Sequence, residues 1–273
     1  MKSVVIYSRK RLNNPAGMLG AIALAPRHGG LVDVSDRVKV METQTGIKIS
    51  MLSPETLLGP LNDVEKKNAP PRLFAAGSME LPLPRPRVAI IGSRKASAKG
   101  LETASHIARV LSRRGVVIVS GLAEGIDAMA HQTAIEEGGR TIAVLGTPLN
   151  RTYPQKNFEL QKEIMKHHLA ISQYPVGYPI QRRNFVMRNR TMALISNSSI
   201  IVEAGETSGS LHQGWEALRL GRPLFIWKSI MSDPSLNWPK KMMKYGAVEL
   251  TNPKQVLDVL PSSKRISQIT VKI

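Results

Sequence analysis

The stretch VAIIGSRKASAKG joins an apolar run to a glycine turn and two cations. The turn consists of Gly92, Ser93, Arg94 and Lys95. An apolar run, a small-residue turn and an amphipathic segment in succession form the pattern of a strand, a tight turn and a helix. A helix that begins after such a turn offers backbone N–H groups to an anion, and adjacent cations add positive charge. The pattern therefore predicts phosphate binding, whether the phosphate belongs to a nucleotide, a dinucleotide cofactor or a nucleic acid.

Two further glycine turns precede helical patterns, in SGLAEGIDAMAH and in GETSGSL. They contain Ser120 and Gly121 in the first case, and Ser208, Gly209 and Ser210 in the second. None of the three turns fits GxGxxG, and GxxxxGK[ST] does not occur, so we expect neither a dinucleotide cofactor nor a P-loop ATPase. Asp127 either orients the loop or caps the helix, and we interpret His131 as a packed polar residue.

The run FVMRNR places an aromatic ring and cations on one turn of a predicted helix. Phe185 and Asn189 are i, i+4 neighbours, and Arg188 and Arg190 lie beside them. A nucleobase stacked on Phe185, with Arg188 or Arg190 on its phosphate, would use this set. The alternative is that Phe185 belongs to the core and that the arginines bind helix ends or acidic loop residues such as Glu203 and Glu206.

The sequence supplies no catalytic set. Glu203, Glu206 and Glu216 lie in or near the third glycine turn, but no nucleophile is paired with a base, so we interpret them as structural or ion-pairing residues. The chain has no cysteine, which excludes disulfides, thiolate catalysis and cysteine-based zinc sites, and its six histidines form no HExxH motif. We therefore expect no enzymatic activity, no metal and no cofactor.

Charge is the strongest signal in the composition. The chain holds 38 Lys and Arg against 20 Asp and Glu, and more than half of the surplus lies in residues 83–228. Such an excess favours nucleic acid as a partner, although a basic surface that serves solubility would give the same balance. Aromatic residues make up 4%, which argues against a large stacking platform. No apolar run reaches the ~18 residues of a membrane span, and we expect a cytoplasmic protein without a membrane partner.

Short strands and helical patterns alternate from residue 87 onward. The predicted strands are VAII (88–91), VVIV (116–119), TIAVL (141–145), LAIS (169–172), SIIVE (199–203) and PLFIW (223–227). The helical patterns cover about 98–114, 126–138, 157–167, 186–196 and 209–220. Strands that are apolar on both faces and separated by helices form a parallel sheet covered on both sides, so the sequence predicts a doubly wound, mostly parallel α/β fold.

The predicted loops at the carboxyl ends of these strands are basic. They carry Arg94, Lys95, Arg151, Lys156, Arg182 and Arg183, with Asn157 next to Lys156. Ligands of doubly wound folds bind beyond the carboxyl ends of the strands. Because the basic residues and this edge coincide, we expect an anionic ligand there.

The remainder of the chain predicts a three-part organisation. Residues 1–80 are expected to form a small N-terminal α/β appendage and linker, with a strand at 4–7, glycines at 29–30, a helix at 54–61 and a Pro-rich linker over 71–87. Residues 81–262 are expected to form the core, which ends in a helix–strand–helix unit at about 235–260. Residues 263–273 are expected to form a polar C-terminal tail.

Taken together, these motifs make the chain similar to the DNA processing protein A family, also called DprA or Smf. The matching motifs, in order, are PPRLFAAG (70–77), VAIIGSR (88–94), SGLAEGIDAMAH (120–131), GGRTIAVLGTPL (138–149), YPQKN (153–157), FVMRNR (185–190) and VEAGETSGSL (202–211). The resemblance implies a Rossmann-like domain that binds single-stranded DNA without chemistry, forms a homodimer and helps to load a RecA-type recombinase. By position, it implies a strand-binding set of Ser93, Arg94, Lys156, Phe185, Arg188 and Asn189.

Two alternatives belong to the same broader superfamily. Nucleotide phosphoribohydrolases have a motif of roughly PGGxGTxxE where this chain has EAGETSGSLHQ. The position of the carboxylate that they require is occupied here by His212 or Gln213. Hydrolysis is therefore disfavoured, whereas a domain that senses a small nucleotide stays open as an alternative. A scaffold that uses its basic surface only for protein contacts is a third class.

Overall fold

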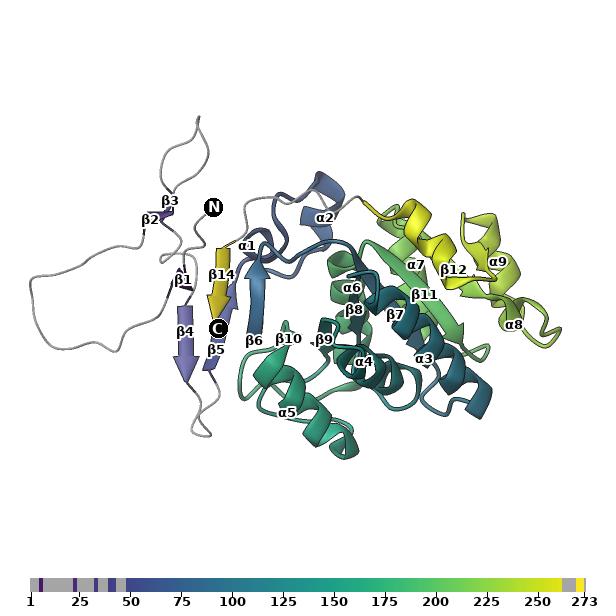
Figure 1. The fold of residues 1–273 in the computed structure, drawn as a ribbon, viewed down its shortest axis with the longest axis horizontal. Helices are drawn as coiled ribbons and strands as arrows, with labels where there is room; N and C mark the ends of the chain where they lie inside the picture. The colour runs from purple at the N-terminus through teal and green to yellow at the C-terminus, as the bar shows by residue number, and fades with distance from the viewer. Residues whose placement is uncertain are drawn as a thin grey trace, which may run out of the picture.

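The computed structural model describes residues 5–6, 22–23, 32–33, 39–42, 48–261 and 269–272. Its centre is a sheet of seven parallel strands (Figure 1). In spatial order these strands are β10 (Leu169–Ser172), β9 (Thr141–Leu145), β8 (Val117–Ser120), β7 (Arg87–Gly92), β11 (Ser198–Glu203), β12 (Leu224–Trp227) and β13 (Val248–Leu250). The chain winds outward from β7 to β10 in one direction and from β11 to β13 in the other. The topological switch point therefore lies between β7 and β11, where such folds bind ligands.

Helices cover both faces of the sheet. On one face lie α3 (Ala98–Ser112), α4 (Ile126–Glu136), α5 (Phe158–His167) and the 3-10 helix η3 (Pro253–Val259). On the other face lie α1 (Pro54–Leu58), α6 (Arg182–Ile195), α7 (Ser210–Arg219) and α9 (Trp238–Lys244). Side chains alternate along β7, so that Ile90 packs beneath α3 and Ile91 packs on the opposite side. Figure 1 shows α3, α4 and α5 in front of the sheet.

The two-sided apolar pattern explains why these strands form. All five residues of β9 are buried, as are all four of β8 and of β10. A strand that is buried on both faces gains apolar burial from every residue, which is the arrangement of parallel sheets. The six predicted strands and five predicted helices are confirmed, as are the helix–strand–helix unit near the C-terminal end and the doubly wound α/β class.

The segment 71–87 differs from the linker that its prolines predict, because it contains strand β6 (Leu73–Leu81). This strand pairs antiparallel with β10 and also with β5 (Lys48–Leu52), which in turn pairs with β4 (Lys39–Glu42). Leu73 and Ala75 face one apolar cluster, and Phe74 faces another. The prediction of a linker here was wrong, because Leu73 to Ala76 are buried in a strand that extends the sheet beyond β10.

The expected tail also contains a strand, β14 (Ile269–Lys272), which pairs antiparallel with β6 and parallel with β1 (Val5–Ile6). The predicted strand at 4–7 and helix at 54–61 correspond to β1 and α1. Two short elements complete this region, the hairpin of β2 (Ile22–Ala23) with β3 (Val32–Asp33) and helix α2 (Asp63–Asn68). The glycines at 29–30 lie outside the described residues, and the three-part division of the chain stays a prediction. No helix in the described ranges is long and apolar enough to cross a membrane.

Candidate nucleic-acid interface

The loops that follow β7 and β8 pack directly against each other at the carboxyl edge of the sheet. The backbone N–H of Ile126 donates to the carbonyl of Ser93 at 3.3 Å. Gly125 has a φ of 74°, and a Cβ at this position would overlap the carbonyl oxygen of Ser93. Both the conformation and the close approach therefore require glycine here. The glycine turn of SGLAEGID thus serves to join two loops.

The loops that follow β7, β8 and β9 enclose, together with helix α6, a cavity of about 50 Å³. Its lining residues are Arg94, Gly121, Ala123, Glu124, Tyr153, Pro154, Phe185 and Arg188. Four of the residues predicted as a binding site therefore come together, although they are as far apart as positions 94 and 188 in the chain. The parallel strands produce this convergence, because their carboxyl ends meet at one edge.

The accessible part of the cavity is an aromatic and cationic cluster. The rings of Tyr153 and Phe185 lie with their centroids 5.3 Å apart at an angle of 49°. The guanidinium carbon of Arg94 lies 5.7 Å from the centroid of the Phe185 ring, within the range of a cation–π contact. Arg94 is exposed, Tyr153 is half exposed and Phe185 is partly buried between them. This cluster presents a positive charge beside two ring surfaces to solvent.

Arg188 lies beneath this cluster and is only 5% exposed. Its Nη1 donates to the carbonyl oxygens of Gly121 and of Val144, the latter at 2.8 Å. The carboxylate of Asp127 accepts the N–H of the same glycine at 3.1 Å, so Gly121 is held from both sides. A Cβ on Gly121 would overlap the Arg188 guanidinium. Arg188 therefore fixes the loop after β8, and it does not face solvent as a surface phosphate contact would.

Burial shifts the pKa values of two groups beneath the cavity, and the charge of each opposes the shift of the other. Burial lowers the pKa of the Arg188 guanidinium, and the nearby negative charge of Asp127 opposes this. Burial likewise raises the pKa of Asp127, and the charge of Arg188 opposes the shift. The Nε of Arg188 finds no hydrogen-bond partner in the described part of the chain, although it is buried. The pair thus forms a polar layer under the exposed aromatic cluster.

The N-terminus of α3 is already occupied by side chains of the protein. Ser97 caps the helix by accepting the N–H of Gly100 at 3.0 Å. The carboxylate of Glu203 accepts the N–H of Ser97 at 3.0 Å and its hydroxyl at 2.5 Å. The backbone N–H of Ser93 donates to the Glu203 carbonyl at 2.7 Å. Glu203 thus takes the N–H groups of Ser93 and Ser97, and phosphate binding by the rest of this turn stays a prediction.

Other predicted site residues also bond inward. A Cβ on Gly92 would lie 2.6 Å from the side chain of Ile126, so this glycine allows close packing. The hydroxyl of Ser120 donates to the carbonyl of Ile90 at 2.6 Å. The amide of Asn157 donates to the carbonyl of Leu122 at 2.9 Å. The structure therefore places these three residues in the support of the loops.

The third glycine turn lies at the start of α7, away from the cavity lining. The hydroxyls of Ser208 and Ser210 lie 2.7 Å apart, and the amide of Asn189 donates to the carbonyl of Gly209 at 3.0 Å. Gly209 is exposed, and a Cβ on it would meet nothing within 4 Å. Asn189 therefore connects α6 to this turn, while the backbone of the turn stays accessible.

Two of the predicted cations are paired with carboxylates. Lys156 lies 2.6 Å from Glu124, which lines the cavity, and Arg190 lies 3.1 Å from Glu216 on α7. Arg94 and Lys95 form no ion pair within the described residues, and both are exposed. The cations best placed to meet an external anion are therefore those of the loop after β7, with Lys156 at the rim.

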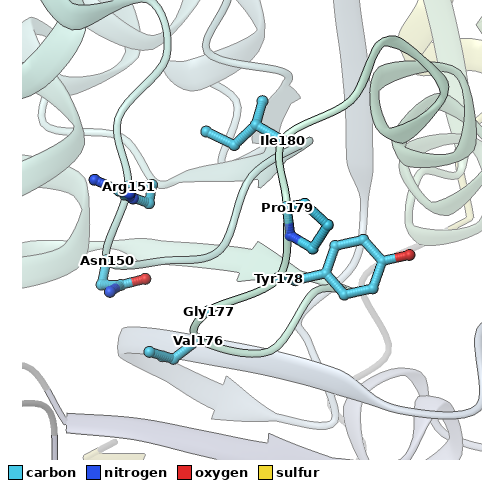
Figure 2. A pocket seen from close by; sticks show the side chains of 7 residues that line it. All are labelled: Asn150, Arg151, Val176, Gly177, Tyr178, Pro179 and Ile180. Atoms are coloured by element: carbon cyan, nitrogen blue, oxygen red, sulfur yellow. The ribbon is translucent and has the colours of Figure 1, made fainter.

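The structure adds residues that the sequence analysis did not select. Tyr153 and Glu124 both line the cavity, although only the neighbouring motif residues were predicted. A second, larger cavity of about 330 Å³ lies between the loops that follow β9 and β10 (Figure 2). It is lined by Asn150, Arg151, Val176, Gly177, Tyr178, Pro179 and Ile180. Aromatic and apolar residues within basic strand-end loops were the signal available in the sequence.

The fold and the strand-end cavity define a Rossmann-like protein with its candidate site beside the topological switch point. The chain belongs to the DNA recombination-mediator protein A family, whose family model matches residues 54–261. This confirms the resemblance that its motifs indicated.

Its curated relatives include DNA processing protein DprA of Bacillus subtilis, with 36% identity over 70% of this chain and 65% of the relative. DprA of Streptococcus pneumoniae is 37% identical over 70% of this chain and 67% of its own length, and protein Smf of Escherichia coli is 35% identical over 70% and 51%. The matched region thus spans between half and about two thirds of the length of these relatives.

Two solved structures of the same family resemble this fold. The structure of DNA processing protein A from Streptococcus pneumoniae superposes with a TM-score of 0.66 at 32% identity, covering 77% of this chain and 74% of that one. DNA processing protein A from Helicobacter pylori gives a TM-score of 0.63 at 25% identity, covering 77% and 94%. The latter structure concerns the single-stranded DNA binding mode of that protein.

Proposed function

We propose that this chain binds single-stranded DNA at the carboxyl edge of its sheet. The observation that carries the proposal is the exposed guanidinium of Arg94 over the ring of Phe185, which in turn lies against the ring of Tyr153 in the lining of one cavity. Cations that follow a backbone and aromatic faces that accept a base are the two parts of a single-strand site. The net charge of +18 and the family of the chain support the same ligand.

The geometry favours a single strand over a duplex. A base can contact the Phe185 or Tyr153 ring only when it is unstacked from its neighbours, which a duplex does not allow without cost. The cations meet phosphates, which carry no base information, so binding is weakly sequence-dependent. Affinity falls steeply with salt because each neutralised phosphate releases counterions.

Two observations weigh against the small-nucleotide alternatives. The cavity at Arg94 and Phe185, about 50 Å³, is far smaller than the roughly 300–1,000 Å³ of pockets that enclose a small ligand, and only the second cavity, about 330 Å³, reaches the lower end of that range. Of the two positions at which the hydrolase carboxylate could fall, His212 is exposed, and Gln213 is buried and donates to the hydroxyl of Ser199 at 2.8 Å, so neither supplies a carboxylate. We therefore propose a binding protein without catalysis. As a recombination mediator it would form a homodimer and help to load a RecA-type recombinase in the cytoplasm, which rests on family membership.

Fluorescence anisotropy of a labelled oligo-dT over a salt series tests the proposal, with duplex DNA and free dTMP as competitors. Arg94→Ala and Lys156→Ala should each weaken binding and reduce the salt slope by about one. Arg114→Ala is the matched control, because Arg114 is an exposed cation that precedes β8 at the opposite edge. Equal affinity of both variants and wild type, with the fold intact, would exclude this site. Displacement of the oligomer by dTMP at comparable concentration would favour the nucleotide sensor.

A further inference from the structure

The larger cavity is a groove between two adjacent strand-end loops. Asn150 and Arg151 come from the loop after β9, and Val176 to Ile180 come from the loop after β10. In Figure 2 the side chains of Val176 and Ile180 point toward the gap between the loops, whereas the ring of Tyr178 points to the other side. The groove therefore has an apolar wall on one side and a cation with an amide on the other.

The apolar side chains of this groove are unusually accessible. Val176 is 46% exposed and Ile180 is 45% exposed. Arg151 is exposed as well, and its guanidinium forms no ion pair within the described ranges of the chain. No carboxylate lines the groove. A base or sugar against the apolar wall and a phosphate on Arg151 would satisfy both sides, whereas a cationic ligand would find no partner.

The wall of the groove is held in place before any ligand arrives. The amide of Asn184 donates to the carbonyl of Pro179 at 2.9 Å, and the hydroxyl of Tyr174 donates to the carbonyl of Asn184 at 3.2 Å. The rings of Tyr174 and Tyr178 lie 4.8 Å apart beneath the loop. A wall fixed by such contacts loses little conformational entropy when a ligand binds.

The groove and the Arg94–Phe185 cavity are built by the same segments. Arg151 lies two residues before Tyr153, which lines the smaller cavity, and the loop that ends at Ile180 leads directly into α6, which carries Phe185. Arg182 lies exposed between the two positions. A chain of phosphates that leaves the smaller cavity along the loop after β9 therefore meets a cationic and apolar surface next.

We propose that this groove binds the nucleotide that follows the one held at Phe185, so that one strand occupies both cavities. The base or sugar packs on Val176 and Ile180, and its phosphate pairs with Arg151. This inference rests on the proposed function. It adds that the binding footprint extends across two strand-end loops, and that Arg151 and Ile180 contribute only when the oligomer is long enough to reach them.

A length series of labelled oligo-dT tests the inference by anisotropy. Arg151→Ala and Ile180→Ser should each weaken binding of long oligomers about fivefold, the effect of losing one phosphate contact or one half-buried apolar contact. Binding of the shortest oligomers should not change, so the length at which affinity reaches its plateau becomes shorter. The controls are Arg114→Ala and Val64→Ser. Val64 is 49% exposed on α2, and α2 lies at the opposite edge of the sheet, since its Glu65 pairs with Arg222 just before β12.

The outcomes separate this inference from the proposed function. If Arg94→Ala weakens all lengths while Arg151→Ala and Ile180→Ser match wild type at every length, the strand does not enter the groove and the inference is wrong. A loss that is equal at all lengths would also overturn it, because it would mark a structural role. If wild type binds no oligomer, both proposals fail.

Discussion

Glu124→Gln is expected to tighten the binding of single-stranded DNA. Its carboxylate lines the cavity and lies 2.6 Å from the Nζ of Lys156. It therefore places a negative charge at the rim and neutralises a cation that a phosphate would use. The two side chains are 36% and 61% exposed, and exposed ion pairs contribute only about 0–1 kcal/mol to the free energy of unfolding. The fold should therefore tolerate the change.

The size of the effect follows from Coulomb's law. A phosphate bound to Lys156 would lie roughly 6 Å from the Glu124 carboxylate, and two unit charges at that separation in water repel by about 0.7 kcal/mol. Removing the repulsion corresponds to about threefold tighter binding, and salt screening reduces this gain. The released Lys156 also neutralises its phosphate more completely, so the salt slope should become steeper, but by less than about 0.7, the value for a whole new contact, because Lys156 already contributes in wild type.

The assay is anisotropy of labelled oligo-dT across a salt series, with thermal unfolding as the check on the fold. Asp63→Asn is the matched control, because Asp63 is an exposed carboxylate 4.0 Å from Lys66 on α2, at the opposite edge. The double variant Glu124→Gln with Lys156→Ala should lose the steeper slope. Weaker binding by Glu124→Gln would refute the reasoning, since it would mean that Glu124 is needed to position Lys156 for the strand.

Two further predictions concern the residues beneath the site. Gly121→Ala should lower the free energy of unfolding by about 3 kcal/mol in urea titrations, because the new Cβ displaces the buried Arg188 guanidinium from two carbonyls. The control is Gly209→Ala, whose Cβ meets nothing within 4 Å and which should change the free energy of unfolding by less than about 0.5 kcal/mol. An equal effect of the two substitutions would contradict the prediction. Burial lowers the pKa of His131 to about 3, so the folded state resists its protonation and wild type should lose stability as pH falls from about 6.5 toward 3. His131→Gln removes this pH dependence, so the difference in free energy of unfolding between wild type and variant should shift by about 2 kcal/mol between pH 7 and 5. Parallel plots of the free energy of unfolding against pH would show that His131 does not titrate in this way.

The strands and helices of the core could be predicted because their signal is local. A run such as TIAVL between two helical patterns indicates a strand that is buried on both faces of a parallel sheet. Strand β6 was missed because the prolines on either side of it, together with Gly77 within it, resemble a loop in the sequence. A Cβ on Gly77 would overlap the carbonyl of His168, a contact that only the folded sheet brings about.

For the candidate site, the sequence indicated the edge of the sheet at which its residues lie, but not the orientation of their side chains. Sequence places Arg188 and Asn157 near the carboxyl edge, yet it does not say whether a polar side chain points outward to a ligand or inward to a carbonyl. Both point inward, where each donates to backbone carbonyls of neighbouring segments. For the same reason the sequence did not show that Glu203, from a strand over 100 positions later in the chain, accepts a hydrogen bond from Ser97 at the N-terminus of α3.

The candidate site therefore consists of two layers with different physical roles. The buried layer of Asp127 and Arg188 fixes the backbone of the loop after β8, and a change there alters stability before it alters binding. In the outer layer, the exposed Arg94 can change without leaving an unpaired buried charge, so its substitution should alter affinity alone, whereas Phe185 also packs against Gly146 and Tyr153. A binding surface that stacks bases needs this division, because an aromatic ring accepts a base only when the loops that aim it do not move. Loss of affinity at unchanged stability is consequently the expected signature of direct contact with the strand.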